Sequence, residues 1–190
     1  MRAMVEREDH YLFSGKVQMG DAYLGEERSG SKSGRGSENK IPFVAAVSVD
    51  SDSHPLRAKL TPVPGFTIKA IKKWSKSHLS NDCLVLSDGL ACFNGVSAAG
   101  CKQIPVIAGD RKPEELPEFN WVNTVLGNIK TSGSYHAFDF SQYAHRYLAA
   151  ITYRFNRRFI LKTLPERLLL AAVSTEPRQA AWLRLAEDSC

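Results

Sequence analysis

The sequence has no long hydrophobic run and no paired cysteine motif. Its 190 residues contain no apolar stretch of the roughly 18 residues that a membrane-spanning helix needs, and the first fifteen residues lack the apolar centre of a secretory signal. The four cysteines form no C-x-x-C pair and have no histidine pair at zinc-ligand spacing. We therefore predict a cytoplasmic protein with reduced, mostly buried thiols and no membrane partner.

Positive charge is in moderate excess. The chain has 25 Lys and Arg against 20 Asp and Glu, a net charge of +5. This balance suits a polyanion such as nucleic acid, but alone it is a weak indication. The length and the 43% of hydrophobic residues are ordinary for one soluble domain with a sizeable core.

The hydrophobic pattern predicts a mixed α/β fold. Period-two alternation and short apolar runs predict five strands, at residues 16–24, 41–49, 55–62, 83–87 and 103–107. Helical periodicity predicts helices at residues 67–79, 90–99, 119–130 and 141–158, and a capping box at Thr163–Glu166 opens a last one. Between the first two strands, a segment rich in Gly, Ser and charge predicts a long loop that exposes Lys32, Arg35 and Lys40. This order indicates a sheet flanked by helices.

Two groups of basic residues are candidate contacts for nucleic acid. On the helix expected at 67–79, four lysines recur at i, i+3, i+4 and i+7: Lys69, Lys72, Lys73 and Lys76. The segment YRFNRRF contributes Arg154, Arg157 and Arg158. A solvated helix face is the simpler explanation of the lysines, and stabilisation of a helix carboxyl end also explains some of the arginines.

Acidic and amide side chains at strand ends suggest a metal site. Asp88 follows a buried strand in VLSDGL, where α/β folds bind ligands, although an Asp-Gly pair also simply forms turns. Together with Asp21 on the first strand, it could share divalent ions that activate phosphoryl transfer. In WVNTVLGNIK, Asn123 and Lys130 lie two helical turns apart, so an amide ligand and a phosphate contact would face the same way.

Six stretches together resemble one family over nearly the whole chain: VQMGDAYLGEE, ENKIPFVAAVS, LSDGLACF, FNWVNTVLGNIKT, YHAF and YRFNRRF. The family is the DDE-type transposases of bacterial insertion sequences, in particular the ISXO-like group. The resemblance implies a ribonuclease-H-like, retroviral-integrase-like fold over residues 16–162, between a short segment 1–15 and a helical tail 163–190. It also implies two Mg²⁺ (or Mn²⁺) ions and cutting and joining of DNA at transposon ends and target. Asp88 matches the second catalytic Asp, Asn123 the third position and Lys130 the trailing Lys.

The first catalytic position departs from the family. Gly20 stands where the Asp belongs, and Asp21 is its neighbour. Adjacent strand residues point to opposite faces, so Asp21 reaches the site only if the strand bulges, which Gly20 would permit. Family members also carry an amino-terminal zinc ribbon and helix-turn-helix, whereas about fifteen residues precede the first strand here. We expect a truncated copy that has lost the first acid.

Three functions stay open on this basis. The first is a metal-dependent transposase that uses Asp88, Asn123, Lys130 and Asp21. The second is a non-catalytic remnant that binds DNA or forms homo-oligomers or mixed assemblies with a full-length transposase. The third is a stand-alone ribonuclease-H-like nuclease, which the transposase motifs make the weaker alternative.

Overall fold

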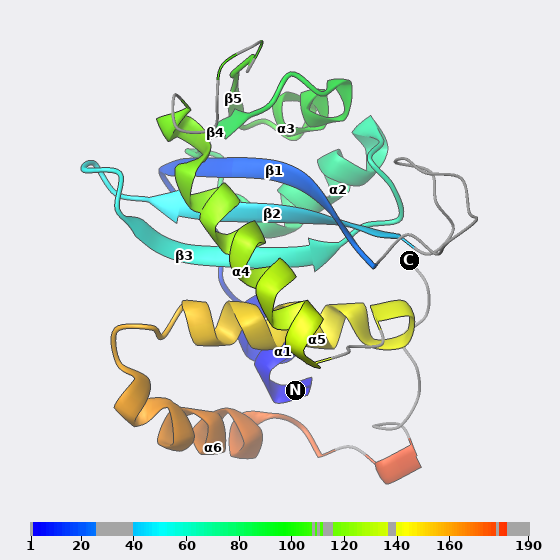
Figure 1. Cartoon of the computed structure of the whole chain (residues 1–190), viewed down its shortest axis with the longest axis vertical. Helices are drawn as coiled ribbons and strands as arrows, with labels where there is room; N and C mark the ends of the chain where they lie inside the picture. The colour runs from blue at the N-terminus through cyan, green and yellow to red at the C-terminus, as the bar shows by residue number, and fades with distance from the viewer. Residues whose placement is uncertain are drawn as a thin grey trace.

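A five-stranded sheet forms the centre of the molecule (Figure 1). The computed structural model describes residues 2–25, 40–107, 109, 111, 116–136, 140–177 and 179–181, and only the backbone of 132–136 and 140–142. The strands are β1 (Lys16–Leu24), β2 (Ile41–Val49), β3 (Pro55–Pro62), β4 (Leu84–Ser87) and β5 (Lys102–Pro105), in the order β3-β2-β1-β4-β5. β1 to β3 are antiparallel neighbours, and β4 and β5 run parallel to β1. This mixed order with β1 at its centre confirms the predicted ribonuclease-H-like α/β fold.

Of the helices described, some cover the two faces of the sheet and others pack on those helices. The helices are α1 (Arg2–Asp9), α2 (Ile68–His78), α3 (Asn94–Ala98), α4 (Asn120–His136), α5 (Phe140–Phe155, kinked at Tyr143) and α6 (Leu164–Ser174). Short 3-10 turns, Ala91–Phe93, Pro117–Phe119 and Leu161–Thr163, precede α3, α4 and α6. Among the residues described, no helix is long and apolar enough to cross a membrane.

Strand residues alternate between two hydrophobic cores. Val17, Met19, Val44 and Ala46 pack with residues of α2 and α3 on one face. On the other face, the core combines strand residues with α4 and α5: Phe43, Ala45, Val47, Val122, Val125, Ile129 and Leu148. Because both faces of β2 are covered, its sequence is almost continuously apolar rather than alternating. Figure 1 shows α4 crossing one face of the sheet while α2 lies behind it.

Several predicted elements differ from the observed ones. The strand predicted at 103–107 is Lys102–Pro105, the helix predicted at 119–130 continues to His136, and the helix predicted at 141–158 ends at Phe155. The capping box is wrong: the Thr163 hydroxyl caps no backbone N–H, but donates to the Ile160 carbonyl at 3.0 Å and accepts from Arg167 Nε at 3.0 Å. Helix α1 was not predicted. Lys40 is half-buried rather than exposed, and the rest of the predicted loop, with Lys32 and Arg35, lies outside the described residues.

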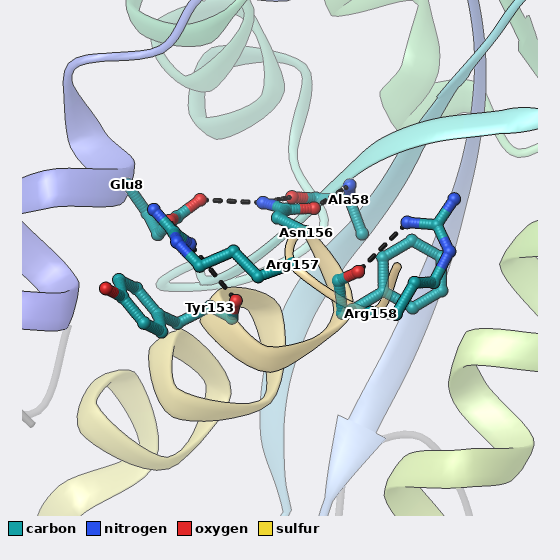
Figure 2. A network of polar contacts seen from close by, with 7 residues as sticks. Glu8, Ala58, Tyr153, Asn156, Arg157 and Arg158 are labelled. Carbon is teal, nitrogen blue, oxygen red and sulfur yellow. Dashed lines mark hydrogen bonds and ion pairs between the residues drawn. The ribbon is translucent and has the colours of Figure 1, made fainter. Parts of the chain in front are cut away.

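The end of α5 closes the β3 edge of the sheet (Figure 2). The Asn156 amide pairs with the backbone of Ala58 in β3: Ala58 N–H donates to Oδ1 at 2.7 Å, and Nδ2 donates to the Ala58 carbonyl at 3.0 Å. Asn156 Nδ2 also donates to Glu8 of α1 at 2.6 Å. The Asn156 amide therefore forms the two hydrogen bonds that the backbone of a neighbouring strand would form with Ala58. Without it, these backbone groups at the sheet edge would be unpaired.

Candidate functional site

Gly20 and Asp88 lie at the end of the pairing between β1 and β4. The parallel register pairs Met19 with Ser87, the last residue of β4, and Gly20 and Asp88 are the residues that directly follow this last pair. Gly20 faces α4, because a Cβ atom added to it would lie 3.1 Å from Val122 Cγ1. The position that the family match gives to the first acid is thus on the α4 face of the sheet, beside the second acid.

Asp21 lies on the opposite face. The pairing of β1 with β2 runs without a shift from Lys16 to Leu24, so the bulge that would turn Asp21 toward Asp88 does not form. Asp21 pairs with Val44, whose side chain belongs to the core under α2 and α3. Tyr23, two residues on, packs edge-on against Phe66 just before α2, with ring centroids 5.4 Å apart. Period-two geometry therefore separates Asp21 from the α4 face.

Asp88 is half-buried and shapes a turn. Its Oδ1 accepts the backbone N–H of Leu90 at 3.1 Å, the local bond by which Asp residues open turns. The end of β4 before it is held firmly: Ser87 Oγ accepts from Gln103 at 2.9 Å, and the Ser87 carbonyl accepts from Val106 at 2.7 Å. The turn role is observed, and a role in metal binding stays a prediction.

Asn123 and Lys130 are both exposed on α4, as the two-turn spacing predicts. The opposite side of α4, with Val122, Val125 and Ile129, is buried against the sheet. Asn123 therefore lies one residue after the side chain that contacts Gly20, on the exposed flank of the helix.

Gln18 positions the start of α4, and sequence reasoning missed it. This side chain is 1% exposed, and its Oε1 accepts the N–H groups of Trp121 at 3.0 Å and Val122 at 3.4 Å. It satisfies two backbone donors in the first turn of the helix, which have no partner within the helix. The available signal was a polar residue between Val17 and Met19 in the central strand, on the same face as Gly20.

The basic residues divide into two groups. Lys69, Lys72, Lys73 and Lys76 are all exposed on α2, as is Arg154 on α5. Arg157 instead forms an ion pair with buried Glu8 at 2.6 Å, and its guanidinium stacks on Tyr153.

Arg158 is also used within the fold. It donates to the carbonyls of Phe155, at 2.9 Å, and Pro55, and burial lowers its pKa. Two of the three arginines of the YRFNRRF segment thus have structural partners, and a role for them in DNA binding is untested.

Among the residues that the structure describes, the oxygen ligands predicted for the α4 face do not fit a pair of Mg²⁺ ions. A two-metal centre needs a carboxylate that both ions share, and Gly20 supplies no oxygen beside Asp88. Among the described residues, no group of three or more His, Cys, Asp or Glu side chains could hold a metal ion. Of the three predicted metal ligands, Asp21 faces the other side of the sheet, which leaves Asp88 and Asn123.

Comparison with known proteins supports the motifs. The family model described as ISXO2-like transposase domain matches residues 12–156. A search of curated proteins gave no match. One solved structure, described as "Crystal structure of a pre-cleavage Mos1 transpososome", is similar at 12% identity and a TM-score of 0.30. The alignment covers 94% of this chain and 61% of that chain. This chain therefore spans about three fifths of the length of that chain. Since the family model covers most of the sequence, from before β1 to the end of α5, the chain belongs to the ISXO2-like transposase domain family.

Proposed function

We propose that this chain is a DNA-binding transposase domain that does not itself cut and join DNA by the two-metal mechanism. One observation carries the proposal: the residue on the α4 face beside Asp88 is Gly20, and the nearest acid in β1, Asp21, faces the other way. In the two-metal mechanism, two ions held close together stabilise both the attacking and the leaving oxygen, and Asp88 would be the only carboxylate among the described site residues to hold them.

The remaining site residues can still contact nucleic acid. Asp88 and Asn123 offer at most a weak site for one Mg²⁺ or Mn²⁺, because such ions bind through few protein oxygens and complete their shell with water and phosphate. Lys130, exposed on the same flank of α4 as Asn123, would meet a DNA phosphate as a point charge. Membership of a transposase family supports DNA as the partner.

A domain with these properties would act on transposition through binding. If it joins a full-length transposase in a mixed assembly, it contributes a DNA contact but no complete metal centre. We therefore expect it to inhibit an active relative rather than replace it.

Restoring the acid tests the proposal. We expect Mn²⁺ calorimetry to show weak or no binding to the natural chain and at least about 10-fold tighter binding to Gly20→Asp, because a second carboxylate then faces Asp88. The same gain should disappear in Gly20→Asp/Asp88→Asn. Gly20→Ala is the matched control, since it adds the same Cβ against Val122 without a carboxylate.

The opposite pattern would restore the enzyme hypothesis. If the natural chain binds Mn²⁺ as tightly as Gly20→Asp, loses it in Asp88→Asn and nicks duplex DNA with Mn²⁺, another ligand completes the centre. The proposed loss of catalysis would then be wrong.

A further inference from the structure

The four lysines of α2 form an exposed basic surface, here called the α2 lysine face: Lys69, Lys72, Lys73 and Lys76. The other side of the helix is buried through Ile71, Trp74 and Ser75, so the helix cannot rotate to hide the lysines. Lys76 lies seven positions after Lys69, which is about 10 Å along the helix axis at roughly 1.5 Å per residue.

The spacing of the four lysines does not stabilise helix α2. Helix α2, IKAIKKWSKSH, contains no acid, so its lysines repel one another at i+3 and i+4 without an acidic neighbour in the helix. Lys69 lies in the first turn, where the helix dipole disfavours a cation. Within the part of the chain that the structure describes, no ion pair joins these four ammonium groups to an acid. The neighbouring helix α3, NGVSA, is uncharged.

The α2 lysine face and the Asp88 site lie on opposite sides of the sheet. Helix α2 packs on the core that contains Val17, Met19 and Val44, whereas α4 packs on the core that contains Phe43, Ala45 and Val47. In Figure 1 the strands separate the two helices. The α2 lysine face and Lys130 therefore belong to helices on opposite sides of the sheet.

From this geometry we infer that the α2 lysine face binds the sugar-phosphate backbone of a second duplex DNA segment, different from the one at α4. The inference rests on the proposed function, since it takes DNA as the partner. B-DNA presents one negative charge per about 1.7 Å of its axis, or about six over the roughly 10 Å of this surface, so a duplex offers enough phosphates to neutralise the four ammonium groups. Lysines in this pattern read no base edges, so binding here is independent of sequence.

Charge-matched variants test the surface. Lys72→Gln/Lys76→Gln removes two charges from the α2 lysine face, and Lys102→Gln/Lys162→Gln removes two exposed lysines elsewhere. Binding of a fluorescent 30-base-pair duplex is measured at several salt concentrations. We expect the slope of log affinity against log salt to fall by about 2 in the α2 variant, because each phosphate contact contributes about 0.9, and to change little in the control. Equal changes in both variants would overturn the inference, since only net charge would then matter.

Stoichiometry tests the second segment. At saturation, native mass spectrometry should find two duplexes per chain, one after Lys72→Gln/Lys76→Gln and one after Lys130→Ala. A maximum of one duplex for the natural chain would overturn the inference while leaving the proposed function intact. If the natural chain binds no DNA at all, the proposed function itself fails. A melting curve of each variant confirms that it is folded.

Discussion

Gly20 and Gln18 lie two residues apart on the same face of β1, and their roles differ completely. Gln18 holds the first turn of α4 through two backbone N–H groups, while Gly20 leaves the position beneath Val122 without a functional group. The scaffold that would aim an acid at Asp88 is therefore present although the acid is not. This is why a single substitution, Gly20→Asp, is enough to test the metal centre.

Arg154, near the end of α5, and Arg157, just after it, give a matched pair for the arginine contacts. We expect Arg157→Ala to lower the free energy of unfolding by about 3–5 kcal/mol, because it leaves the Glu8 carboxylate buried without its ion pair. Arg154 is exposed, so Arg154→Ala should change stability by less than about 0.5 kcal/mol. Urea unfolding of both variants measures the difference, and similar losses would refute the structural role of Arg157.

At the scale of whole elements, glycine distinguishes an open helix surface from a tight contact. Gly127 is inside α4, and a Cβ added there would meet nothing within 4 Å. In α3, a Cβ on Gly95 would lie 2.5 Å from the Ile68 carbonyl oxygen and 2.7 Å from the Lys72 nitrogen, both backbone atoms of α2. The same mutation should therefore have opposite effects in the two helices.

We expect Gly127→Ala to raise the free energy of unfolding by about 0.5–1 kcal/mol, through the lower backbone entropy of the unfolded chain. Gly95→Ala should lower it by about 1–3 kcal/mol, because α2 and α3 must move apart. Thermal unfolding of the two variants shows whether each substitution raises or lowers the stability. Stabilisation by both changes would mean that α2 and α3 are not in close contact.

The elements that follow from local sequence were predicted well. The first three strands have the predicted bounds, Lys16–Leu24, Ile41–Val49 and Pro55–Pro62, because alternation and apolar runs record their burial directly. Helix α1 was missed because it is held in place by hydrogen bonds from Asn156 and Arg157 to Glu8. These contacts join distant parts of the chain and leave no pattern in the local sequence.

The same limit applies to the candidate site. The opposed directions of Gly20 and Asp21 followed from strand periodicity, and the structure shows an unbroken register. The bonds from Gln18 to the start of α4 join residues more than a hundred positions apart, so only the folded chain reveals them.

For the molecule as a whole, a half-buried histidine makes stability depend on pH. His78 accepts a contact from Lys59 Nζ at 3.2 Å, and burial, then the Lys59 and His145 charges, lower its pKa from 6.5 to about 3. The unfolded chain thus binds a proton at His78 below about pH 6.5 while the folded chain does not. Stability contributed by neutral His78 is present above that pH and falls as pH drops toward 3, by at most about 1.4 kcal/mol per pH unit.

Replacing the imidazole should flatten this profile. We expect His78→Gln, which keeps an acceptor for Lys59, to lose less stability between pH 6 and pH 4 than the natural chain, as measured by urea unfolding at each pH. The exposed His10→Gln is the control. An unchanged slope in His78→Gln would show that other groups cause the acid sensitivity.

The contact between Glu8 and Arg157 also bears on how the chain is made. The two residues are 149 positions apart, so at about 5–20 residues per second a ribosome needs roughly 7–30 s after Glu8 to add its partner. β3 is complete once Pro62 has been added, and from then until Asn156 and Arg157 are made the β3 edge has no cap. The nascent chain therefore passes through a long stage with an open sheet edge, the stage at which chaperone binding or pairing with a neighbouring chain would compete with its completion.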